Sequence, residues 1–286
     1  MKEQIGIIGF GVLGKALKVI FEPKFKITIY DKYKKRYPNL TNLIKKSTVV
    51  FVAVPTPMKK SGEIDLSYVK EVLSHLSKGV KKEKKKIIVV LRSTIIPGTT
   101  DLFQKKYKNL KLVFNPEFLT EKNLLSNLKN TNRVVIGSNN KVSKKVVKSI
   151  YKQIFPKATY FLTNSKTAEL IKYASNIMLA SQIITANEIY QVSKKLGLNY
   201  KKIKNNLLLD KRIGTNITVP GNDGKLGFGG KCFPKDLNAF IVFSKKIGYN
   251  SELLNQIWKT NLKLRKEKDW EKIKGATSKN RFYLKG

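Results

Sequence analysis

Short apolar runs alternate with longer amphipathic stretches over residues 1–162. The run 48–54 reads TVVFVAV, and its unbroken apolar character is typical of a strand buried on both faces of a parallel sheet. The alternation predicts an α/β fold: a doubly wound, Rossmann-like parallel sheet. Further strands are expected at 4–9, 25–30, 87–91, 111–114 and 134–136, and helices notably at 15–21, 66–76 and 142–154.

The pattern changes after this region. Residues 165–196 contain no glycine or proline and repeat apolar positions at helical spacing, which predicts one long helix ended by Gly197. We therefore expect an all-helical domain at 163–270, built on that long central helix, and a loosely ordered basic tail at 271–286. The other helices expected in this domain lie at 200–209, 234–247 and 252–270.

Composition narrows the class of protein. The 41% apolar fraction fits a folded chain, and no run approaches the roughly 20 apolar residues of a membrane span. The chain enters an ordered motif at its start, so we expect no targeting segment. A single cysteine permits no internal disulfide, and a reducing, cytoplasmic location is the default expectation.

The formal net charge of +39 suggests nucleic acid as a partner, but we disfavour this interpretation. All but six of the 58 basic residues are lysine, whereas contacts to phosphate and base edges favour arginine. The lysines are also spread along the whole chain. The charge is instead expected to concentrate small anionic ligands.

A GxGxxG pattern, GFGVLG at 9–14, follows the first strand and opens the first helix. Gly9 permits the tight turn, Gly11 lets a pyrophosphate approach the backbone, and Gly14 allows close packing of helix on strand. The helix N-terminus supplies amide donors to the phosphates. The alternative is a glycine turn in a sheet without a nucleotide.

An acid at the end of the second strand supports the nucleotide interpretation. Asp31 is expected to accept from the adenosine ribose hydroxyls and to repel a 2′-phosphate, which favours NAD over NADP. Lys32 and Lys34 weaken that preference, because a nearby cation tolerates an extra phosphate.

Cys232 lies in the glycine-rich stretch PGNDGKLGFGGKC (220–232), next to Lys231 and just before a helix begun by Pro234. A helix N-terminus and neighbouring cations stabilise a thiolate, which is the nucleophilic form of cysteine. The alternative is a buried apolar cysteine. The flanking glycines and charges favour the nucleophile.

A set of ordered motifs resembles the UDP-glucose/GDP-mannose dehydrogenase family and covers residues 5–261. The resemblance implies an N-terminal dinucleotide domain, a helical dimerising middle, and a C-terminal nucleotide-binding domain. The motifs are VAVPTP (52–57), GEIDLSYV (62–69), RSTIIPGTTD (92–101), NPEFLTE (115–121), NRVVIG (132–137), AELIKYASN (168–176), DKRIG (210–214) and GFGGKCFPKD (227–236).

The resemblance assigns roles to matching residues. Lys172 and Asn176, four apart on the long helix, hold the reacting oxygen, and Asp236 serves proton removal with Lys172 and a water. Without the motifs these would be a helix-surface pair and a favoured first-turn acid, and Glu121 a surface acid. The implied catalytic residues are Cys232, Lys172, Asp236, Asn176, Glu117, Glu121 and Thr94, the last three for thioester hydrolysis.

The same matches predict the binding residues, and no metal site is expected. The cofactor-binding residues are Gly9, Gly11, Val12, Leu13, Gly14, Asp31, Pro55, Thr56 and Thr94. The substrate-binding residues are Phe118, Leu119, Lys172, Asn176, Arg212, Phe228 and Gly229.

The implied activity oxidises the C6 alcohol of a nucleotide sugar to a carboxylate, with NAD as cofactor and a Cys232 thiohemiacetal and thioester as intermediates. The chain ends before the family's C-terminal domain, so that domain comes from a separate chain, the substrate is smaller, or the protein is an inactive NAD-binding remnant. A one-step β-hydroxyacid dehydrogenase is the enzymatic alternative. The resemblance also implies a homodimer through the long helix.

Overall fold

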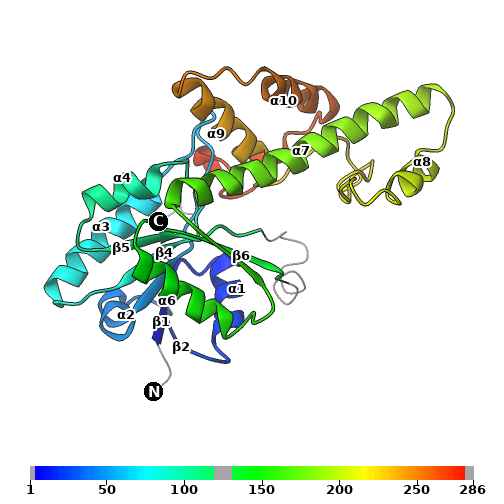
Figure 1. Cartoon of the computed structure of the whole chain (residues 1–286). Coiled ribbons are helices and arrows are strands. Elements are labelled where there is room, and N and C mark those ends of the chain that lie inside the picture. The colour runs from blue at the N-terminus through cyan, green and yellow to red at the C-terminus, as the bar shows by residue number, and fades with distance from the viewer. Residues whose placement is uncertain (1–3, 119–130, 281–286) are drawn as a thin grey trace. The chain divides into compact units, whose positions relative to one another are not determined.

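The protein is built around a seven-stranded sheet (Figure 1). The computed structural model describes residues 4–118 and 131–280. The sheet order is β2-β1-β3-β4-β5-β6-β7, with the first strand of the chain second from one edge. The strands are β1 (Gln4–Ile8), β2 (Lys26–Tyr30), β3 (Val49–Val52), β4 (Ile88–Leu91), β5 (Lys111–Phe114), β6 (Arg133–Gly137) and β7 (Thr159–Thr163).

Helices cover both faces of this sheet, which confirms the doubly wound, Rossmann-like fold. Alternate residues of each strand enter opposite cores: in β3, Val50 and Val52 pack on one face and Val49 and Phe51 on the other. The first core takes α2 (Leu40–Lys46), α3 (Ser67–Lys82) and α4 (Thr99–Lys106), and the second takes α1 (Val12–Phe21) and α6 (Lys141–Lys152).

The sheet differs from the sequence expectation at one edge. β5 and β6 are antiparallel and share a single bridge, Phe114 with Gly137, so the sheet is mostly rather than wholly parallel. β7, which the apolar pattern did not indicate, pairs in parallel with β6. β7 lies at the edge of the sheet and is only partly buried, with Phe161 50% exposed. An edge strand does not need the unbroken apolar run that identified the inner strands, and β7 does not have one.

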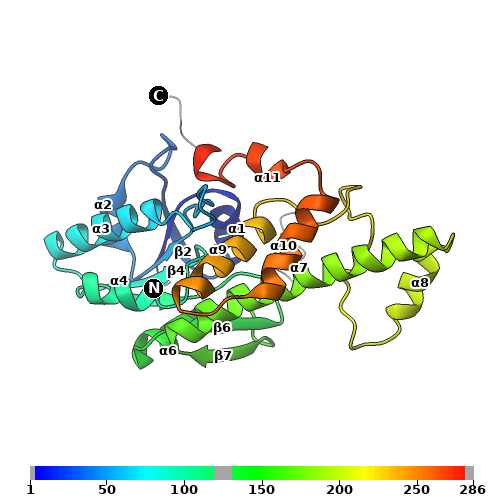
Figure 2. The same ribbon diagram turned by 90° about the horizontal axis from the view of Figure 1, so that it is seen from above.

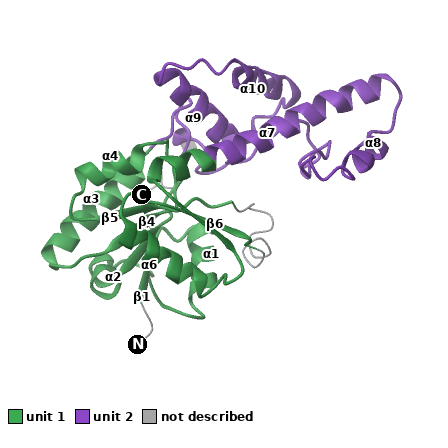
Figure 3. Ribbon diagram, in the orientation of Figure 1, with its two compact units in different colours: residues 1–56, 66–172 green, residues 57–65, 173–286 purple. Residues whose placement is uncertain are grey.

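The chain divides into two compact units (Figure 3). Unit 1 comprises residues 1–56 and 66–172, and unit 2 comprises residues 57–65 and 173–286. The long helix α7 (Ser165–Lys195) is confirmed and spans the division. Unit 2 is otherwise helical, with α8 (Tyr200–Leu207), α9 (Phe233–Lys246), α10 (Glu252–Leu264), the short α11 (Asp269–Lys272) and the 3-10 turn η2 (Ser278–Asn280).

Two details of unit 2 differ from the expectation. The helix predicted for 252–270 ends at Leu264, because Arg265 leaves helical geometry and α11 forms separately. The tail at 271–286 was expected to be loosely ordered, but within its described part, up to residue 280, the backbone pairs with Met58, whose N–H donates to the carbonyl of Ala276 and whose carbonyl accepts from the N–H of Ser278. Within this unit α9 and α10 lie side by side (Figure 2). No helix of the described segments combines the length and apolarity of a membrane span.

Packing at the β1–α1 turn generates a stability prediction. A Cβ on Gly14 would overlap the carbonyl oxygen of Gly9, so Gly14→Ala should lower the free energy of unfolding by about 3 kcal/mol. Gly11→Ala is the matched control, because its Cβ would meet nothing within 4 Å; its cost should stay below about 1 kcal/mol. Thermal unfolding of both variants checks this, and equal midpoints would contradict it.

Candidate functional site

The β1–α1 turn of unit 1 is shaped for a dinucleotide. Gly9 has a φ of 89°, and its N–H bonds the carbonyl of Tyr30 at 3.0 Å. Gly11 forms the N-cap of α1, and the space where a side chain would stand is open. The amides of Val12 and Leu13 begin the helix and lack intrahelical acceptors. An anionic group can therefore approach this helix start closely, as a pyrophosphate requires.

Asp31, at the end of β2, is buried and holds this turn. Its carboxylate accepts from the backbone N–H of Phe10 at 2.7 Å and of Tyr33 at 3.0 Å. Both nearby lysines have partners of their own. Lys34 donates to the carbonyl of Phe10 at 2.8 Å, and Lys32 pairs with Glu71 at 2.5 Å, a side-chain hydrogen bond that raises the pKa of Lys32.

Lys172 forms a buried ion pair within unit 1. Its Nζ donates to Glu117 twice, to the carbonyl oxygen at 2.7 Å and to Oε1 at 2.9 Å. Lys172 is only 4% exposed, so the acid offsets the cost of burying its charge. The ring of Phe118 lies 5.8 Å from the same ammonium and 4.0 Å from the Arg133 guanidinium. The sequence-predicted residues Glu117, Phe118 and Lys172 thus come together.

The turn carrying Glu117 is held by Arg92, a residue that the sequence analysis did not single out. The buried guanidinium donates through Nη1 to Asn115 Oδ1 at 2.5 Å and to the carbonyls of Asn115 and Pro116 at 3.2 Å. Asn115 Oδ1 also accepts from the hydroxyl of Tyr151 at 2.6 Å. The sequence did offer one indication of this role: Arg92 begins the motif RSTIIPGTTD directly after the buried strand β4.

Glu169 is a second residue that sequence reasoning missed. Its fully buried carboxylate accepts from the N–H of Gly98 at 2.5 Å, the N–H of Thr100 at 2.8 Å and the hydroxyl of Thr100 at 2.5 Å. Burial raises the pKa of Glu169 to about 7, although these hydrogen bonds act in the opposite direction. The residue therefore ties the start of α7, three residues before Lys172, to the beginning of α4.

In unit 2 an acid and an amide meet beside the predicted nucleophile. Asp236, 1% exposed in the first turn of α9, accepts from Asn176 Nδ2 at 2.5 Å. Its other oxygen pairs with the ammonium of Lys235, which the sequence analysis did not identify. The backbone N–H of Asp236 donates to the carbonyl of Cys232 at 2.8 Å. The pairing of Lys172 with Asp236 joins different units and stays a prediction.

Cys232 is half-buried at the N-cap of α9, with Pro234 in the first turn. This geometry suits a thiolate, because the helix start favours negative charge. Phe228, expected to contact substrate, has a buried side chain that packs against Phe233 and Trp258. Gly229 lies in the same loop.

The remaining predicted residues are spread between the units. Thr94 and Pro55 are half-buried and Thr56 is buried, all near the carboxyl ends of β3 and β4. Arg212 is 89% exposed and pairs with Asp210 at 2.6 Å within its own turn. Leu119 and Glu121 lie outside the described residues.

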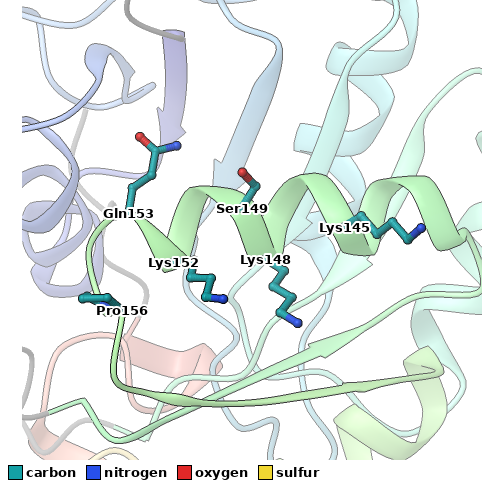
Figure 4. Close-up of a pocket in the computed structure, with 6 residues that line it drawn as sticks. All are labelled: Lys145, Lys148, Ser149, Lys152, Gln153 and Pro156. Carbon is teal, nitrogen blue, oxygen red and sulfur yellow. The ribbon is translucent and has the colours of Figure 1, made fainter.

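A surface depression of about 580 Å³ lies on α6 (Figure 4). None of the predicted site residues lines it, so it does not mark the candidate site. The depression is lined by Lys145, Lys148, Ser149, Lys152, Gln153 and Pro156.

Within the described ranges no three His, Cys, Asp or Glu side chains are grouped as metal ligands.

Two family models match the chain. Residues 13–155 match the model described as the UDP-glucose/GDP-mannose dehydrogenase family, NAD binding domain, and residues 166–263 match the central domain of the same family. A UDP-glucose 6-dehydrogenase of Rickettsia bellii is 36% identical over 223 residues, which are 76% of this chain and 50% of the relative.

Solved structures show the same fold. A UDP-glucose dehydrogenase from the archaeon Pyrobaculum islandicum superposes with a TM-score of 0.82 at 27% identity, covering 91% of this chain and 68% of that one. A 3-hydroxyisobutyrate dehydrogenase of Mycobacterium tuberculosis gives a TM-score of 0.72 over 94% of this chain and 95% of its own. Its 16% identity supports a shared fold alone.

The raised pKa of Glu169 predicts that stability depends on pH. Between the ordinary value of 4.5 and about 7 the folded chain keeps a proton that the unfolded chain has released, so stability falls as pH rises through this window. Glu169→Gln removes the titrating group and should reduce the fall by at most about 3 kcal/mol. Urea unfolding of both proteins from pH 5 to 8 measures it; parallel curves would refute it.

Proposed function

Because the chain belongs to the UDP-glucose/GDP-mannose dehydrogenase family, we propose that it oxidises the C6 alcohol of a nucleotide sugar to a carboxylate with NAD, as UDP-glucose 6-dehydrogenases do. The observation that carries the proposal is the buried Asn176–Asp236 pair, one helical turn from Cys232 at the start of α9. A thiol and an acid at the start of α9, with an α7 amide bonded to the acid, are the groups that alcohol oxidation through a thioester needs.

The residues of the β1–α1 turn fit NAD. The open space at Gly11 and the amides of Val12 and Leu13 suit the pyrophosphate, and Asp31 lies where a ribose is expected. When bound, NAD would supply the hydride acceptor, and each of the two oxidations would consume one NAD. Pro55, Thr56 and Thr94 complete the proposed contacts. The ion pair of Lys32 with Glu71 supports NAD over NADP, because the Glu71 carboxylate offsets the charge that would attract a 2′-phosphate.

Proton removal from the alcohol falls to Asp236, assisted by Lys172. Asn176 orients the carboxylate of Asp236 and, in the proposed role, also donates to the reacting oxygen. The ammonium of Lys172 stabilises negative charge on that oxygen. Loss of the proton and a hydride gives the aldehyde.

Cys232 then retains the aldehyde. The thiolate sulfur attacks the carbonyl carbon, and the oxygen takes up a proton to give a thiohemiacetal. Loss of the hydroxyl proton and a second hydride gives a thioester on Cys232. Water attacks the thioester carbon, the thiol leaves, and the carboxylate is released. Glu117, with Glu121 and Thr94, is proposed to position that water.

The chain spans about half the length of the curated relatives it matches. The sugar, its nucleotide and the whole reaction are therefore proposed. A separate chain that carries a nucleotide-binding domain is proposed as a partner. Self-association through α7 is also proposed, and the exposed apolar residues Met178, Val192 and Leu196 support it. A cytoplasmic location, which suits a lone thiol, belongs to the same proposal.

A one-step β-hydroxyacid dehydrogenase is the second candidate. A lysine and an asparagine four apart on the long helix favour it. That reaction needs no cysteine and yields one NADH per substrate. An NAD-binding remnant would yield none.

The thioester route predicts two NADH and one carboxylate per nucleotide sugar. Cys232→Ser should lower net acid formation by at least about a thousandfold, because serine forms no thioester. NAD affinity should stay unchanged, since Cys232 is not among the residues proposed to contact NAD. NADH absorbance and product analysis with UDP-glucose and GDP-mannose measure both.

The outcomes separate the candidates. Retained acid formation by Cys232→Ser would contradict the nucleophile role, and a stoichiometry of one would favour the hydroxyacid route. NAD binding without turnover of any sugar, alone or with cell extract, would favour the remnant.

A further inference from the structure

The glycine-rich loop that leads to Cys232 is bound along its backbone by asparagine side chains. Asn261, fully buried on α10, accepts from the N–H of Phe228 at 2.7 Å and donates to the carbonyl of Phe228 at 3.1 Å. Asn187 on α7 accepts from the N–H of Gly227 at 3.1 Å. One asparagine thus satisfies both polar groups of Phe228, as a neighbouring strand would.

A buried arginine extends this support to both ends of the loop. Arg265, 3% exposed, pairs through Nη2 with Asp223 at 2.6 Å and through Nε with Asp269 at 3.0 Å. Its Nη1 donates to the carbonyl of Leu226 at 3.4 Å. Asp269 also accepts from the N–H of Gly230 at 3.0 Å. Two carboxylates offset the buried charge, and the loop is fixed two residues before Cys232.

The glycines of this loop are required by these same side chains. A Cβ on Gly227 would overlap Asn261 Oδ1. A Cβ on Gly229 would overlap Asp269 Oδ1 and stand 2.5 Å from Arg265 Cζ. The GFGG pattern therefore provides close contact between the loop and the polar residues beneath it.

We propose that Asn261, Arg265 and Asp269, here named the loop clamp, are positioning residues that hold Cys232 at the N-cap of α9. The inference rests on the proposed role of Cys232 as nucleophile. A loop with four glycines between Gly224 and Gly230 has high conformational entropy, so it would not keep its last residues at a helix start without such support. Catalysis needs the thiol within a fraction of an ångström of its working position.

The single cysteine permits a direct test, because the rate of thiol alkylation reports on Cys232 alone. The rate of iodoacetamide alkylation of the folded protein is measured from pH 5 to 10. Asn261→Ala removes both bonds to Phe228, and Arg265→Lys keeps the charge but loses the simultaneous links to Asp223 and Asp269. Each should raise the midpoint of the rate profile by about half a pH unit or more, because the thiol leaves the helix start.

Lys263→Gln, an exposed position on the same helix, is the matched control and should keep the wild-type profile. Circular dichroism and NAD binding establish that each variant is folded. If Arg265→Lys does not fold, Asn261→Ala decides the result, since it alters no charge. Folded variants with the wild-type midpoint would overturn the loop clamp.

Turnover gives a second readout. With an active substrate the loop-clamp variants should lose about tenfold or more in kcat while KM for NAD is unchanged. If the wild-type chain turns over no nucleotide sugar, the proposed function fails, and the alkylation profiles still decide whether the clamp positions the thiol.

Discussion

The burial of charge is the constraint on which the rest of the structure depends. A chain with 58 basic and 19 acidic residues leaves most of its lysines solvated, where they need no partner. Inside the units the reverse holds, because an uncompensated buried ion is costly. Several of the few acids therefore pair with buried or half-buried cations: Glu117 with Lys172, Asp236 with Lys235, and Asp223 and Asp269 with Arg265. The groups with proposed chemical roles are held by these pairs.

The sequence predicted the inner strands and the long helix well, because both carry a strong local pattern. β3 is buried at every position, and residues 165–196 lack any helix breaker. The missed elements have weak patterns. α2 has seven residues and depends on the Asn39 side chain as its N-cap, and β7 is half polar at the sheet edge. The end of α10 was missed because Arg265 is fixed by Asp223, which is distant in sequence.

The sequence motifs indicated the residues with proposed chemical roles, but not the residues that hold them in place. The motifs identified Cys232 and Asp236 because they are continuous in sequence. Arg92 and Glu169 act on residues 23 to 71 positions away, and no local periodicity indicates such contacts. The motifs that contain Arg92 and Glu169 were recognised, but the residues that these two side chains bond became known only from the structure. Gly227 and Gly229 illustrate the difference. The sequence showed that the loop is rich in glycine, but the side chains of α10 and α11 that exclude a Cβ at these positions were visible only in the structure.

The segment 57–65 belongs to unit 2 although the chain on both sides of it belongs to unit 1. Met58 pairs with Ala276 and Ser278, and Glu63 pairs with Lys246. Met58 and Glu63 are therefore synthesised some two hundred residues before the residues that they pair with. Unit 2 therefore cannot be excised as one continuous piece. An exchange of this unit between related chains would have to carry both segments, and on the ribosome its completion is delayed until Ser278 has appeared.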